Sequence, residues 1–380
     1  MTLRSLILLP LAMTALALGM STGQGLYYLL FFSSAALCLL GLITVIWLKA
    51  TLKCAVAVRE RRVDRGGPVH MAVQIDHRCP LPISEAALLI RCGEGARPAA
   101  MRLKAFKENI LDAVLPTHHV GAFECGLEEA LITDAFGLFR VTAAVPETQI
   151  VYVLPVPFEM QEMDVAAGDE GRSLLNHTQE DYASPEDVRK YQPGDALKRV
   201  HWKLSYRKQE LLVRQYETPA PPDILLIPDP YEPEEKDGDR EKALRLKDTV
   251  SETVCSVAKI HLMKGSPVRV PFYGGGGTFS SDGAEALDTL REMLARQTPE
   301  GQGAFDRILL LEARNMKKTG SVGIVTTRLT PEVVEAAGRL RQQGPGATMY
   351  YVTFNAETAE RDPLVARLQH YMVEVCYVTP

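Results

Sequence analysis

At 380 residues the chain is too long for one ordinary domain, and its length suits two or three. Hydrophobic residues make up 46% of it and charged residues 23%, a balance typical of globular proteins that excludes a disordered or fibrous chain. The formal net charge of -5 gives the protein no general affinity for nucleic acid.

The N-terminal region differs from the rest because no charged side chain occurs between Leu6 and Leu48. Residues 26–48 are numerous enough to cross a hydrocarbon core of about 30 Å as a helix. A shorter apolar run precedes them, and its polar flanks extend it to about residues 4–22. Residues 1–52 therefore predict a hairpin of two transmembrane helices. A cleaved signal peptide is the alternative for the first run, but a second run so soon afterwards favours the hairpin.

Basic residues predict the orientation of this hairpin. One precedes the first run, the connecting turn has none, and six follow the second run: Arg4, then Lys49, Lys53, Arg59, Arg61, Arg62 and Arg65. The positive-inside rule therefore places both ends in the cytoplasm. Seven scattered cysteines without a C-x-x-C motif predict reduced thiols, which agrees with that compartment.

The region after the hairpin divides into three parts that differ in their pattern of apolar and polar residues. Residues 54–155 hold short alternating stretches between Pro and Gly, which predict a β-sandwich. Residues 156–188 are polar and irregular, and we expect a linker or extended loop. From residue 223 onward, apolar strand-like runs alternate with helical patterns, which predicts a mostly parallel, doubly wound α/β domain. Residues 189–380 thus combine a distinctive basic segment with this domain.

The basic segment, residues 189–216, carries eight basic and two acidic side chains with aromatic residues among them. Its Y-x-P-G-D and H-W-K strings resemble the bacterial "domain of unknown function 58" family. The residues of this first signature are Tyr191, Pro193, Gly194, Asp195, Arg199, His201, Trp202, Lys203 and Arg214. A second string is similar to that family's other signature, with Ala135 in place of the usual Pro: Asp134, Phe136, Gly137, Leu138 and Phe139.

The resemblance implies an inner-membrane protein whose C-terminal domain is similar to a von Willebrand factor A domain. Its implied partners are a MoxR-type AAA+ ATPase and a transglutaminase-like membrane protein, and it implies no established enzymatic activity. Such domains hold Mg²⁺ through oxygen ligands, but here Tyr231 and Pro233 replace the serines that should follow Asp229. Asp229 and Thr278 would remain as a degenerate site. Glu232 or Glu234 could substitute as a ligand.

We therefore expect a non-catalytic adaptor without a cofactor, held in the inner membrane by two passes and presenting its α/β domain to cytoplasmic partners. A divalent-metal-dependent ligand-binding module and an envelope-related enzyme are the alternatives. For the basic segment, a structural or protein-contact role is favoured over anionic lipid and over nucleic acid. Because Trp202 is large and apolar, we expect it to be buried against the α/β domain.

Overall fold

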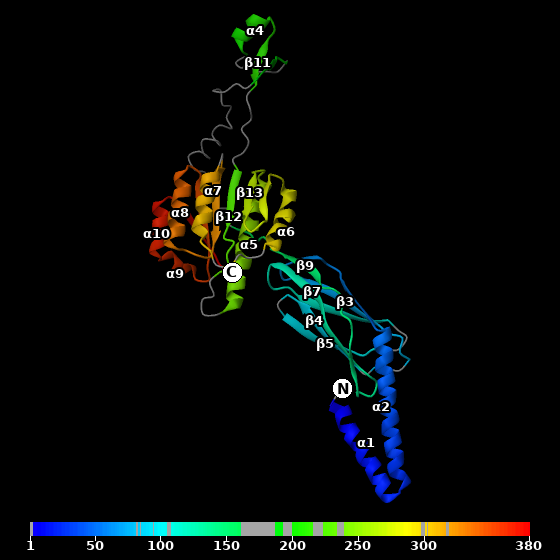
Figure 1. Ribbon diagram of the computed structural model, residues 1–380. Helices are drawn as coiled ribbons and strands as arrows, with labels where there is room; N and C mark the ends of the chain where they lie inside the picture. The colour runs from blue at the N-terminus through cyan, green and yellow to red at the C-terminus, as the bar shows by residue number, and fades with distance from the viewer. Residues whose placement is uncertain are drawn as a thin grey trace. The chain divides into compact units, whose positions relative to one another are not determined.

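The structure is a computed structural model, and its described part comprises residues 3–80, 83, 85–93, 95–104, 108–160, 187–192, 200–215, 223–233, 239–297, 301, 303–316 and 319–380. The chain forms two compact units, Met1–Leu154 and Pro155–Pro380 (Figure 1). Most of the linker predicted at 156–188 lies outside the described residues.

Two apolar helices begin the first unit: α1 (Leu3–Thr22) and α2 (Gly25–Thr51). They are joined at Gly23, whose φ of 70° lies in the left-handed region that glycine adopts without steric cost. Within the described part of the chain, α2 alone is long and apolar enough to cross a membrane, and α1 contributes a shorter apolar stretch. The predicted apolar N-terminal helix is therefore present.

The remainder of the first unit is built from β-strands in two sheets. One sheet has the order β1-β3-β6, and the other has the order β2-β9-β7-β4-β5 with β8 paired to β7. Their bounds are β1 (Lys53–Val58), β2 (Arg62–Asp64), β3 (Pro68–Asp76), β4 (Glu85–Cys92), β5 (Gly95–Met101), β6 (Asn109–Pro116), β7 (Gly121–Thr133), β8 (Arg140–Thr142) and β9 (Gln149–Leu154).

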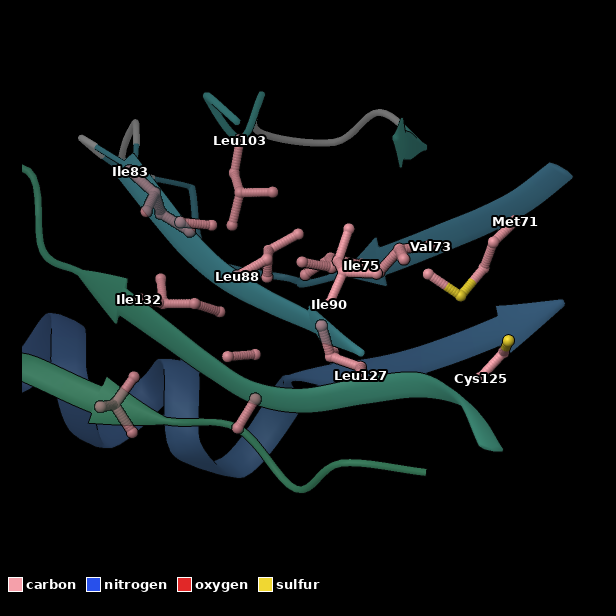
Figure 2. Close-up of a cluster of buried hydrophobic side chains, with 14 of the residues drawn as sticks. Met71, Val73, Ile75, Ile83, Leu88, Ile90, Leu103, Cys125, Leu127 and Ile132 are labelled. Carbon is pink, nitrogen blue, oxygen red and sulfur yellow. The ribbon is translucent and has the colours of Figure 1, made fainter. Parts of the chain in front are cut away.

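One hydrophobic core joins both sheets, and alternate residues of each strand point into it (Figure 2). Val73 and Ile75 come from β3, whereas Ile90 comes from β4 and Leu127 from β7. Leu48 of helix α2 belongs to the same core and is fully buried. The end of the apolar helix is therefore packed into the β-domain.

Cys92 and Cys125 correct the prediction that the cysteines are all reduced. They lie opposite each other in the register of β4 and β7, with their Cα atoms 4.2 Å apart, and form a disulfide. Antiparallel pairing brings together two residues that are 33 positions apart, a proximity that the scattered spacing did not reveal. Disulfides are rare in reducing compartments, so this pair removes the support that cysteine usage gave to a cytoplasmic location.

The second unit contains a six-stranded sheet of order β14-β13-β12-β15-β16-β17. Its strands are parallel except for β14, which forms an antiparallel hairpin with β13. Their bounds are β12 (Asp223–Pro228), β13 (Val268–Phe272), β14 (Gly277–Ser281), β15 (Thr319–Thr326), β16 (Gly346–Val352) and β17 (Glu374–Val378).

Helices pack on both faces of this sheet. One apolar cluster joins it to α5 (Arg240–Met263) and α6 (Leu287–Arg296), the latter preceded by the short η3 (Ala284–Ala286). A second cluster joins it to α7 (Phe305–Asn315), α8 (Pro331–Gln342) and α10 (Pro363–His370), which follows the short α9 (Ala356–Glu360). The alternation of strand and helix has produced a doubly wound α/β domain.

His261 in α5 makes the stability of this unit depend on pH. Burial, with a smaller contribution from Lys264, lowers the pKa of His261 to about 4. The unfolded chain takes up this proton near pH 6.5, so acidification from there to about pH 4 favours unfolding, by up to about 3 kcal/mol.

We therefore expect the free energy of unfolding to fall less steeply across this window in His261→Gln than in the wild type. Denaturant unfolding at a series of pH values measures both slopes. Equal slopes would contradict the assignment to His261.

Candidate functional site

The strand order of the second unit places a candidate site at the carboxyl ends of its two central strands, β12 and β15. The chain runs from β12 outward to β13 on one side and later returns to β15 on the other side. In doubly wound folds, ligands bind outside the carboxyl ends of the strands at this point of reversal. Asp229 follows β12 and Thr326 ends β15, so both lie there.

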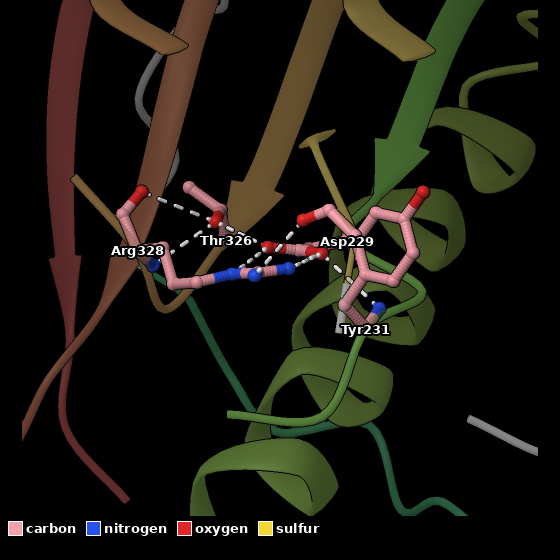
Figure 3. Close-up of polar contacts among 5 residues, drawn as sticks. Asp229, Tyr231, Thr326 and Arg328 are labelled. Carbon is pink, nitrogen blue, oxygen red and sulfur yellow. Dashed lines mark hydrogen bonds and ion pairs between the residues drawn. The ribbon is translucent and has the colours of Figure 1, made fainter. Parts of the chain in front are cut away.

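Asp229 is the centre of a polar network at these strand ends (Figure 3). The Arg328 guanidinium donates to both carboxylate oxygens, at 2.8 Å to Oδ1 and 3.1 Å to Oδ2. The Thr326 hydroxyl donates to Oδ2 at 2.9 Å, and the backbone N–H of Tyr231 donates to Oδ1 at 3.2 Å. Both carboxylate oxygens are therefore engaged by donors.

The ion pair is largely removed from solvent. The side chain of Asp229 is 3% exposed and that of Arg328 is 16% exposed. Arg328 also lies over the Tyr231 ring, 5.1 Å from its centroid, and donates to the Gly303 carbonyl. A bidentate, stacked guanidinium is held firmly because its planar fork matches the carboxylate.

This arrangement does not fit a resident Mg²⁺. A metal ion requires free carboxylate oxygens, whereas Arg328 supplies the positive charge at Asp229. Thr278, the second residue of the predicted degenerate site, is exposed on the edge strand β14, two strands away from β12. Glu232 is exposed, and Glu234 lies outside the described residues.

The first signature forms a small structure in its described part. Strands β10 (Asp187–Lys190) and β11 (Leu212–Gln215) pair antiparallel, and α4 (Trp202–Lys208) lies between them in the sequence. Val200 and Val213 are buried and form a β-bridge. Ser205 of α4 accepts from the backbone N–H of Leu212 at 2.9 Å, which fixes the helix to β11. We call this element the signature hairpin, residues 187–215.

His201 begins helix α4 as its N-cap. The Nδ1 atom of His201 accepts a hydrogen bond from the Leu204 backbone N–H at 3.3 Å. That contact gives the histidine of the H-W-K string a structural role in starting the helix.

Trp202 and Tyr206 are not buried within the signature hairpin, and the expected packing of Trp202 against the α/β domain stays a prediction. They are one helical turn apart, and their side chains are 62% and 87% exposed. Burial in the hairpin is provided instead by Val200, Leu212 and Val213. Together with Leu211, Lys203 and Arg207 the two aromatic residues line an open hollow. We call Trp202, Tyr206 and Leu211 the aromatic face.

The other residues of the first signature are only partly described. Tyr191 follows β10 and is partly buried, and the backbone of Arg214 lies in β11. Pro193, Gly194, Asp195 and Arg199 lie outside the described residues.

The second signature is the turn between β7 and β8. Asp134 is fully buried, and its Oδ1 accepts from the Phe139 backbone N–H at 2.8 Å. The backbone N–H of Asp134 donates to the Phe139 carbonyl at 3.1 Å, which closes the turn. Gly137 has a φ of 74°, and Leu138 is buried. Asp134 therefore acts as a turn acid.

Comparisons with known proteins bear on the signature region. Residues 187–343 match the family described as "Protein of unknown function DUF58". This match supports the DUF58 resemblance. It covers the signature hairpin and the α/β domain as far as the end of α8. No curated protein matches the chain.

Solved structures give weak likenesses. A cohesin module from Clostridium perfringens is 15% identical, with a TM-score of 0.22, and the match covers 27% of this chain and 97% of that one. The sporulation control protein Spo0M from Bacillus subtilis is 8% identical with a TM-score of 0.16, covering 37% and 58%. Cwp6 from Clostridium difficile is 10% identical with a TM-score of 0.18, covering 86% and 37%. TM-scores this low carry no argument about fold or function.

Arg328 is the residue of the site that the sequence did not predict. It lies two positions after the end of β15, but its partner Asp229 is 99 positions earlier. A basic residue just past a central strand, facing an acid just past its neighbour, is the signal that could have revealed it.

Removing Arg328 should destabilise the α/β domain strongly. Arg328→Ala leaves the buried Asp229 carboxylate without its counter-charge, which typically costs about 3–5 kcal/mol. The matched control is Arg367→Ala, because the Arg367–Glu335 pair is exposed at 46% and 53%. That change should cost at most about 1 kcal/mol. Denaturant unfolding measures both variants, and an equal effect would contradict a stabilising role for the Asp229 pair.

Proposed function

We propose that the protein is a non-catalytic adaptor in the bacterial inner membrane whose signature hairpin binds a cytoplasmic protein partner. The observation that carries the proposal is the aromatic face. Trp202 and Tyr206 are large, rigid side chains left exposed side by side, and such residues dominate the energy of protein interfaces. An apolar surface of this kind is a candidate contact for a partner.

The charges around the aromatic face indicate the chemistry of that partner. Lys203, Arg207 and Lys208 lie on α4, and Lys190 pairs with Glu210 at 2.9 Å. An acidic protein surface with an apolar pocket complements this arrangement. A MoxR-type AAA+ ATPase is the partner that the family resemblance implies, and a transglutaminase-like membrane protein is a second. Nucleic acid is disfavoured by the net charge of -5.

We propose that α1 and α2 cross the membrane as a hairpin with the remainder of the chain in the cytoplasm. The six basic residues that follow the apolar run at 26–48, the first of them in the last turn of α2, and the absence of any in the hairpin turn support this orientation. The Cys92–Cys125 pair favours an oxidising compartment instead. We give more weight to charge, because basic residues beside a membrane helix act directly on its insertion.

The second unit serves, on this account, as a von Willebrand A-like scaffold without metal. The parallel sheet with one antiparallel edge strand supports that likeness. The ion pair between Asp229 and Arg328 opposes a metal-dependent module. Among the described residues, no group of three or more His, Cys, Asp or Glu side chains is arranged to hold a metal ion.

Capture of partners from native membranes tests the proposal. We expect Trp202→Ala with Tyr206→Ala to abolish co-purification of the partner while leaving the melting temperature unchanged, because both side chains are exposed. The matched control is Phe354→Ala, an exposed aromatic residue (41%) outside the signature hairpin, which should retain the partner.

Full retention of the partner by the double variant would contradict the proposal. A large drop in its melting temperature would instead assign the two aromatic residues to the core.

A further inference from the structure

The second signature packs directly against the apolar helix α2. A Cβ atom on Gly41 would lie 3.0 Å from Oδ2 of Asp134 and 3.1 Å from the Phe139 ring. Gly41, Thr44 and Leu48 are the buried residues of α2, and their spacing places them on one face of the helix. The β7–β8 turn is therefore held against the helix at Gly41, where the lack of a side chain permits close approach.

The opposite face of this part of α2 stays apolar and exposed. Leu42, Ile43, Ile46 and Trp47 are between 46% and 61% exposed. A helix segment touching the β-domain on one side and presenting apolar side chains on the other is suited to lie at a membrane surface. Trp47 and Lys49 are residue types that anchor helices at that interface.

The rise per residue of an α-helix gives the depth of the β7–β8 turn in the membrane. Gly41 lies six residues before Trp47, about 9 Å further toward the hairpin turn at 1.5 Å per residue. The helix from Gly25 to Gly41 has 17 residues by the numbering, which is at the lower end of the length needed to cross the hydrocarbon core. The turn packed on Gly41 is thus level with the boundary between headgroups and acyl chains.

Phe136 is the exposed residue of that turn. Its side chain is 38% exposed, whereas Asp134 and Leu138 on either side are buried. We propose that Phe136 inserts into the membrane interface, so that the second signature fastens the β-domain to lipid as well as to α2. The bilayer is the occupant because the turn packs on α2 at Gly41, which lies within the charge-free run proposed to cross the membrane. This inference rests on the proposed membrane insertion.

Fluorescence quenching by brominated lipids tests the insertion of Phe136, with the full chain reconstituted into vesicles. The chain has two tryptophans, so Trp47→Phe with Trp202→Phe removes both. In that background we expect Phe136→Trp to lose emission in brominated vesicles, as we expect of Phe32→Trp, an exposed position within the part of α2 proposed to cross the membrane. The matched control is Phe123→Trp, at the other end of β7 and about 33 Å from the turn by strand rise, which should keep its emission.

The outcomes separate the two proposals. Quenching of the Phe32→Trp variant without quenching of the Phe136→Trp variant would overturn the lipid contact and leave the membrane hairpin intact. Absence of quenching in the Phe32→Trp variant would overturn the membrane insertion and the inference with it. If the tryptophan variant does not fold, Phe136→Cys carrying a polarity-sensitive dye, with the five free cysteines replaced by alanine, gives the same readout, and a blue shift is expected only on vesicles.

Discussion

Burial of Leu48 in the core of the β-domain is the contact on which the rest of the arrangement depends. Leu48 ends the charge-free stretch of the sequence and is fully buried among residues from both sheets. Complete burial of a leucine contributes about 2 kcal/mol, and Val45 and Leu52 pack beside it. Helix α2 continues without a break from Gly25 to Thr51. An interaction that holds its first turns in place therefore also fixes the position of the β-domain.

Two parts of the second unit, the sheet and the signature hairpin, differ in how they treat polar and apolar side chains near the surface. At the carboxyl ends of β12 and β15, Asp229 and Arg328 form an ion pair. Their charges neutralise each other, so neither side chain is available to bind a charged ligand. In the signature hairpin, Trp202 and Tyr206 are left open although apolar groups are normally buried. On the proposed function, the open aromatic face is the surface that recognises a protein partner.

Local patterns were sufficient to predict much of the secondary structure. The helical patterns expected from residue 223 onward correspond to helices such as α7 (Phe305–Asn315), and the alternating stretches expected within 54–155 correspond to strands such as β3 (Pro68–Asp76). Strand β14 (Gly277–Ser281) was not predicted, because four consecutive glycines suggest a loop and the strand exists only through pairing with β13.

Contacts between distant residues could not be predicted in the same way. The Cys92–Cys125 pair depends on the register of β4 with β7, and the Asp229–Arg328 pair depends on the order of β12 and β15. The exposure of Trp202 also escaped prediction, because hydrophobicity alone favours burial. Its neighbours Val200 and Val213 already fill the small core of the hairpin.

The central claim is that the hairpin of α1 and α2 holds the soluble units on the cytoplasmic side of the membrane. Reporter fusion after Pro380 measures this directly, with one reporter that is active only in the cytoplasm and one that is active only in the periplasm. We expect activity from the cytoplasmic reporter and none from the periplasmic one. The reverse pattern would contradict it, and would place the Cys92–Cys125 disulfide in the compartment where such bonds are stable.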